Sequence, residues 1–149
     1  MSRNDHFSSF ASTYAQYRPT YPTALFELLA ARSPSTHHAW DCATGNGQAA
    51  VSLASHFNHV TATDIGANMI KHALPHPRVT YQSGSAEAPP LDENYADLIT
   101  VAQALHWFDR PAFWTTCQHI LKPDGILAYW GYLLPKITPP IDAIVDDYH

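Results

Sequence analysis

Two glycines and an acid lie close together in the segment Asp41–Gly47, which reads Asp-Cys-Ala-Thr-Gly-Asn-Gly and joins an apolar stretch to a helical pattern. Gly45 and Gly47 tolerate a positive φ and allow a ligand to approach the backbone without a side chain in the way. The helix that follows has unpaired backbone N–H groups in its first turn. The segment is therefore predicted to bind a ligand, with a plain connecting loop as the alternative that the glycines alone leave open.

A second acid, Asp64, ends the next apolar stretch of the chain. A carboxylate at that place can accept hydrogen bonds from both hydroxyls of a ribose, as in dinucleotide sites. The series Gly45-x-Gly47-x-x-Ala50 also matches a dinucleotide fingerprint with alanine in its last place, so spacing does not exclude NAD. Asp41 favours a ligand with a cationic amino group instead, because its charge would repel a pyrophosphate.

The composition limits the classes of function. The chain has 149 residues, a net charge of −5 and 46% apolar residues, which fits one globular domain and argues against a non-specific nucleic-acid or membrane binder. No metal is expected: of the ten histidines, only His72 and His76 have helical ligand spacing, and Pro75 lies between them. The N-terminal residues show no apolar leader, and two distant cysteines suggest no disulfide framework, so a cytoplasmic location is expected.

Strand and helix patterns alternate along the chain without hairpin signals. This order predicts an α/β fold, a doubly wound Rossmann-like parallel sheet of about five strands with helices on both faces. Its ligand would lie beyond the carboxyl ends of the strands, where Asp41–Gly47 falls. Residues 122–125 are expected to form a turn. Strands are expected at 38–43, 59–64, 78–82, 96–102 and 126–132, and helices at 5–17, 22–32, 47–57, 67–74 and 111–121.

With these elements in place, the chain resembles the class I S-adenosylmethionine-dependent methyltransferases, in the type 11 group. The closest likeness is to the trans-aconitate-type enzymes that act on small molecules, and it covers roughly residues 5–132. The family's first motif corresponds to Asp41–Gly47, with Ala43 where the family usually has a glycine. The remaining motifs correspond to Tyr14–Pro22 (YAQYRPTYP), Asp64–Met69 (DIGANM), Gly84–Glu87 (GSAE), Ala102–Asp109 (AQALHWFD) and Leu121–Trp130 (LKPDGILAYW).

The resemblance implies S-adenosylmethionine as cofactor and assigns roles to individual residues. Asp64 would bind the ribose, Met69 would lie near the adenine, and Gln103 would bind the methionine part. His106 would act as a general base on an acceptor hydroxyl or only pack in the pocket wall. The implied cofactor-binding residues are Asp41, Ala43, Thr44, Gly45, Gly47, Gln48, Asp64, Ile65, Met69, Ser85, Ala86, Glu87 and Gln103.

Residues 1–36 are expected to form a helical lid segment, residues 37–132 the cofactor-binding domain, and residues 133–149 a Pro-rich linker and the start of a helix. The aromatic residues near the N-terminus would close over the site or form an ordinary amphipathic helix packed on the sheet. Substrate or lid contacts are assigned to Tyr14, Tyr17, Arg18, Tyr21 and Trp107.

The family's last two strands are not recognised in this chain, so self-association through the uncovered edge of the fifth strand is expected. The leading function is methyl transfer to a small-molecule acceptor, including one that contains a carboxylate. No nucleic-acid or membrane partner is expected. The alternatives are a non-catalytic S-adenosylmethionine-binding module or truncated fragment, and an NAD-dependent oxidoreductase.

Overall fold

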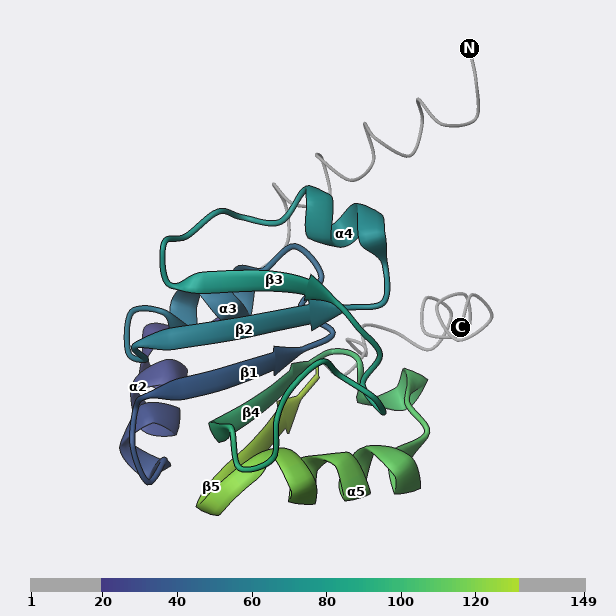
Figure 1. Ribbon diagram of the computed structural model, residues 1–149. Coiled ribbons are helices and arrows are strands. Elements are labelled where there is room, and N and C mark those ends of the chain that lie inside the picture. The colour runs from purple at the N-terminus through teal and green to yellow at the C-terminus, as the bar shows by residue number, and fades with distance from the viewer. Residues whose placement is uncertain (1–19, 132–149) are drawn as a thin grey trace, which may run out of the picture.

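The computed structural model describes residues 20–131, which form one sheet with helices on both faces (Figure 1). The strands are β1 (His38–Cys42), β2 (His59–Asp64), β3 (Val79–Ser83), β4 (Ala96–Ala102) and β5 (Leu121–Trp130). The helices are α2 (Thr23–Arg32), α3 (Gln48–Leu53), α4 (Ala67–Lys71) and α5 (Arg110–Ile120), with the 3₁₀ turn η1 (Leu105–Trp107) before α5. The strand order is β3-β2-β1-β4-β5, and every neighbouring pair is parallel. The predicted α/β parallel sheet of five strands is confirmed.

The order of the strands creates a switch point between β1 and β4. The chain winds from β1 outward through β2 and β3, then returns to the other side of β1 for β4 and β5. The loops that follow β1 and β4 therefore leave the carboxyl ends of the strands in opposite directions, which is the place where sheets of this kind bind their ligands. In Figure 1 this edge lies at the tips of the strand arrows.

Two hydrophobic cores cover the two faces of the sheet, because successive strand residues point to opposite sides. Ala39 and Leu98 pack with the helices α2 and α3 in the first core. Their neighbours Trp40 and Ile99 pack with α5 in the second core. All four residues are fully buried, as expected for central strands of a parallel sheet.

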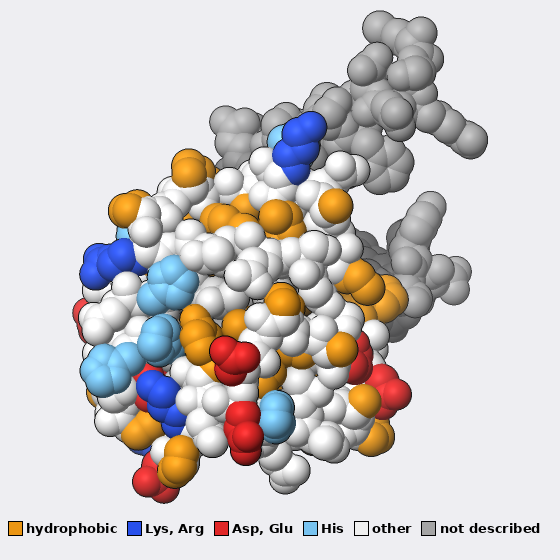
Figure 2. Space-filling view, viewed as in Figure 1, with side chains coloured by type: hydrophobic (Ala, Val, Ile, Leu, Met, Phe, Trp, Pro, Cys, Tyr) orange, Lys and Arg blue, Asp and Glu red, His pale blue; other side chains and the backbone are white. Residues whose placement is uncertain are grey.

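Asp97 links neighbouring segments at the opposite end of the sheet, where the strands begin. Its buried carboxylate accepts hydrogen bonds from Ser35 Oγ (2.7 Å) and from the backbone N–H of His38 (3.0 Å), and it pairs with Lys122 Nζ (3.2 Å). Burial alone would raise the pKa of Asp97, but these bonds outweigh it and the pKa is lowered. Histidine side chains gather at this end of the molecule, at the left of Figure 2. The anchor keeps the start of β1 in register with β4 and β5.

The structure corrects several boundaries. β2 and β4 have the predicted bounds, but β5 begins at Leu121, so the turn predicted at residues 122–125 is wrong. Those residues form an irregularity inside the strand, with Asp124 at φ 64° and a register shift between Ala96 and Leu98 of β4. α2 begins at Thr23, one residue later than predicted, and it buries Phe26 and Leu29. α3 ends at Leu53, earlier than predicted. The helix predicted at 5–17 and the segment 133–149 lie outside the described residues.

Candidate functional site

The turn between β1 and α3 has a backbone that only small residues adopt readily. Ala43, Gly45 and Gly47 all have positive φ, at 54°, 60° and 82°. The N–H of Gly47 donates to the carbonyl of Thr44 (3.0 Å), which closes the turn. A Cβ on Gly47 would come within 2.1 Å of the Tyr81 hydroxyl oxygen, so glycine is required there for space as well as for φ. The sequence prediction of an unusual turn at this place is confirmed.

The buried side chain of Asp41 holds the turn in place through hydrogen bonds. Its carboxylate is 1% exposed, and its two oxygens accept hydrogen bonds of 2.6 Å from the hydroxyls of Thr44 and Thr100. Thr100 belongs to β4, so the acid joins the turn to the strand on the other side of the switch point. Hydrogen bonds to an ionised group are among the strongest that a protein makes. Asp41 thus fixes the loop, and the predicted role opposite a cationic amino group stays a prediction.

Asp64 joins the loops that follow β1 and β2. Its carboxylate oxygens accept one backbone N–H each, from Gly45 (2.9 Å) and from Gly66 (2.8 Å). Each oxygen of an ionised carboxylate has a second acceptor direction, so both can still receive a ligand hydroxyl. Because the acid lies at the carboxyl end of β2, beside the β1 turn, its geometry fits the two adjacent hydroxyls of a ribose.

Two apolar side chains lie exposed directly beside this acid. Ile65 is 80% exposed, and Met69, in the middle of α4, is 38% exposed. Gly66 lies between them, and a Cβ there would approach Met69 Cγ to 3.2 Å. Exposed apolar groups next to a hydrogen-bonding carboxylate form a surface that suits a flat apolar ring attached to a sugar.

The loop after β3 contributes mainly structural contacts. Ser85 Oγ accepts the N–H of Ala88 (3.1 Å), and Ala86 is buried in the second core. The Glu87 carboxylate accepts a hydrogen bond from the N–H of Asp109 (2.9 Å). The backbone carbonyl of Glu87 accepts one from the Thr116 hydroxyl (2.6 Å). Glu87 therefore holds the start of α5, and contacts between this loop and a ligand stay a prediction. Gln48, the first residue of α3, donates its N–H to Asn46 Oδ1 (3.2 Å).

A pocket of about 380 Å³ opens at the carboxyl ends of β4 and β5. Gln103 follows β4 and lines this pocket, with φ 65° and its N–H donated to the Trp130 carbonyl (2.8 Å). The lining residues are Gln103, Ala104, Leu105, His106, Arg110, Tyr129, Trp130 and Gly131. The pocket is open to solvent, and its volume lies within the range of small-molecule sites.

The structure brings some of the predicted substrate residues to this pocket. His106 lines it, and its ring contacts that of Trp107 (centroids 4.8 Å apart), which is 80% exposed. Tyr21 packs edge-on against Trp130 (5.4 Å), behind the pocket wall. The lid residues Tyr14, Tyr17 and Arg18 lie outside the described residues.

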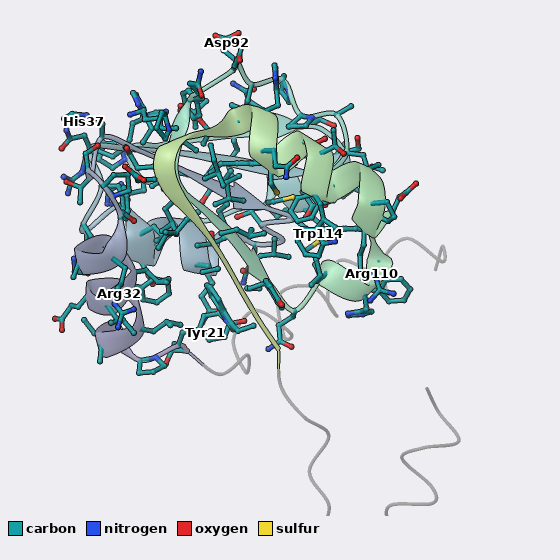
Figure 3. The ribbon with its side chains drawn as sticks, turned by 90° about the horizontal axis from the view of Figure 1, so that it is seen from below. Tyr21, Arg32, His37, Asp92, Arg110 and Trp114 are labelled. Carbon is teal, nitrogen blue, oxygen red and sulfur yellow. The ribbon has the colours of Figure 1, made fainter. Side chains whose placement is uncertain are left out.

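Sequence reasoning missed Arg110, Tyr129 and Trp130 as pocket residues. Arg110 begins α5, whereas Tyr129 and Trp130 end β5. No sequence motif contains all three residues, so only the fold shows that they share a pocket. In Figure 3 Arg110 lies at the start of α5 and Trp114 further along the same helix. Within residues 20–131 no group of three His, Cys, Asp or Glu side chains is placed to hold a metal ion. None of the helices described there is long and apolar enough to cross a membrane.

Comparison with known proteins gives a consistent result. The family model described as a methyltransferase domain matches residues 40–129. A Dictyostelium discoideum protein named as a methyltransferase is 36% identical over 98% of this chain and 56% of its own length. A Mycobacterium tuberculosis protein named in the same way is 32% identical over 85% of this chain and 53% of its own. A solved structure from Anaeromyxobacter dehalogenans, described as a type II methyltransferase, superposes with a TM-score of 0.77 at 41% identity, covering 89% of this chain and 57% of that one.

Proposed function

Because the chain belongs to the methyltransferase-domain family, we propose that it binds S-adenosylmethionine at the carboxyl ends of β1 and β2 and transfers a methyl group to a small molecule. The chain spans little more than half the length of the relatives it matches, so the activity of the whole protein belongs to the proposal. The observation that supports it most is Asp64, whose two oxygens fix the turns after β1 and β2 and keep acceptor capacity for ribose hydroxyls.

The residues around this acid fit the cofactor. Asp64 would bind the ribose, Ile65 and Met69 would contact the adenine, and the backbone near Gly45 would lie against the amino-acid part, with Gln103 at its far end. The cofactor supplies a methyl group on a positively charged sulfur, which is reactive without an acid catalyst. The protein has to position the two reactants and exclude water.

The acceptor would occupy the pocket at the ends of β4 and β5. Its volume of about 380 Å³ suits a molecule with one ring. His106 lines this pocket and would take up the proton of an acceptor hydroxyl as a general base. A carboxylate-bearing acceptor, as in the trans-aconitate-type branch, is the substrate class that we favour.

NAD is the ligand that the turn spacing leaves as an alternative. The buried charge of Asp41, held under the turn by Thr44 and Thr100, disfavours a pyrophosphate at this place. A non-catalytic S-adenosylmethionine-binding module would share the same cofactor contacts and differ only in turnover.

Calorimetric titration with S-adenosylmethionine and S-adenosylhomocysteine tests the proposal, with NAD and Asp64→Ala as controls. We expect micromolar binding of the methyl donor and its product, lost in Asp64→Ala. Tight cofactor binding without turnover over a broad acceptor panel would indicate the binding module. Binding of NAD alone, or of no nucleotide by folded protein, would refute the proposed function.

A further inference from the structure

Among the described residues that line the pocket at the ends of β4 and β5, Arg110 has the only permanent charge. We propose that Arg110 binds a carboxylate of the acceptor and thereby selects the substrate class, a small carboxylic acid with an aromatic or similarly flat apolar body. The inference rests on the proposed function only for the statement that this ligand is the methyl acceptor. The binding of the carboxylate itself follows from the pocket.

The guanidinium of Arg110 has no acid bound to it within residues 20–131. The one ion pair there joins Lys122 to Asp97, at the opposite end of the sheet. The two acids nearest to the start of α5 are engaged with its backbone. Asp109 Oδ1 accepts the N–H of Ala112 (3.3 Å), and Glu87 Oε1 accepts the N–H of Asp109 (2.9 Å). Arg110 is solvent-exposed and lines the pocket, where an unpaired guanidinium can bind a carboxylate through two parallel hydrogen bonds.

Aromatic side chains form the surface beside this charge. Tyr129 and Trp130 line the pocket, and Tyr129 is 57% exposed. Trp114 contacts the Tyr129 ring (centroids 6.2 Å apart) and lies one helical turn after Arg110. The residues labelled in Figure 3 show this order along α5, with Arg110 at its first turn. A ligand with a flat apolar body can therefore stack on aromatic rings while its carboxylate reaches the guanidinium.

The remaining polar groups of the pocket are compatible with an anion. Besides Arg110, Tyr129 and Trp130, the lining residues with polar side chains are Gln103 and His106. Neither of these side chains contains a carboxylate. The lining thus has no acidic side chain that would repel a carboxylic acid. A neutral amide of the same shape would keep the stacking contacts and lose the charge-assisted bonds, so the two ligands should differ in affinity.

Titration of the protein with benzoate and with benzamide, followed by NMR of the tryptophan indole N–H groups, tests the inference. We expect benzoate to bind about fivefold or more tightly than benzamide, with shifts of the Trp114 and Trp130 signals. Arg110→Ala should remove this preference, and Arg110→Lys should restore part of it through charge without the fork geometry. Arg32→Ala, an exposed arginine on α2 that Figure 3 shows across the molecule, is the matched control and should bind benzoate normally.

Two results would overturn the inference. One is equal affinity for benzoate and benzamide; the other is a benzoate preference that survives in folded Arg110→Ala. Cofactor calorimetry separates this outcome from a failure of the proposed function. Either of these results beside normal S-adenosylmethionine binding refutes only the role of Arg110. An Arg110-dependent preference without nucleotide binding confirms the carboxylate site and refutes the methyltransferase proposal.

Discussion

The backbone N–H of Gly45 donates a 2.9 Å hydrogen bond to Oδ2 of Asp64, so the acid that ends β2 holds the turn that follows β1. Asp64 Oδ1 accepts the N–H of Gly66 at 2.8 Å in the same way. One side chain therefore shapes both loops and presents its remaining acceptor directions between them. This arrangement prepares the site before a ligand arrives, which lowers the cost of ordering on binding.

Asp64→Asn should weaken S-adenosylmethionine binding by about 10- to 100-fold, because an amide lacks the charge and one of the two acceptor oxygens. Calorimetry on the variant measures the change. The matched control is Asp92→Asn, an exposed acid in the loop before β4 that lies far from the turn, and it should bind the cofactor normally. Unchanged affinity in folded Asp64→Asn would show that the ribose is held elsewhere.

Thr100→Val should lower the free energy of unfolding by about 1.5–3 kcal/mol, because it removes a hydrogen bond to a buried charged group and leaves that oxygen short of a donor. The bond concerned is the 2.6 Å contact of the Thr100 hydroxyl with Asp41 Oδ1. Chemical denaturation measures the loss. Thr80→Val, an exposed position on β3, is the control and should change stability by less than about 0.5 kcal/mol. An equally small change in both variants would mean that Asp41 does not depend on Thr100.

Ala43→Gly should stabilise the protein by about 0.5 kcal/mol, because relief of the left-handed φ of 54° exceeds the added entropy of the unfolded chain. Thermal and chemical denaturation check the sign. Ala31→Gly, in the right-handed backbone of α2, is the control and should destabilise by about 0.5–1 kcal/mol. If both variants lose the same stability, the turn stores no strain at Ala43.

Stability should fall as the pH drops below 6.5, with His38 as one cause. Burial, followed by the charges of Lys122 and His59, lowers the pKa of His38 from 6.5, although Asp97 opposes this shift. The unfolded chain therefore binds a proton at His38 more readily than the folded protein. This contribution to stability is present above pH 6.5 and is lost as the pH falls through the folded pKa.

Denaturation of the wild type and of His38→Gln between pH 7 and pH 5 measures this effect. The loss of stability over this range should be smaller in His38→Gln than in the wild type. The exposed control His72→Gln should keep the dependence of the wild type. Parallel pH profiles for wild type and His38→Gln would contradict the assignment.

The sequence located the strands that are defined by their own composition. β4 has the predicted bounds because its near-continuous apolar run specifies a buried strand locally, and β2 has the predicted bounds as well. The start of β5 was missed because Pro, Asp and Gly are typical both of a turn and of an irregularity within a strand. Pairing with β4, where the register shifts between Ala96 and Leu98, decided between the two.

By itself the sequence determined the order of strands and helices, the glycine turn after β1 and the acids near the ends of β1 and β2, because local residue types encode these features. Only the tertiary structure decided which groups those acids contact. Asp41 meets Thr100, 59 positions away, and Asp64 meets Gly45, 19 positions away. The same holds for Arg110 in its pocket with Tyr129. Such neighbours depend on how the strands are ordered in the sheet, and that order is fixed by long-range packing, which no local pattern records.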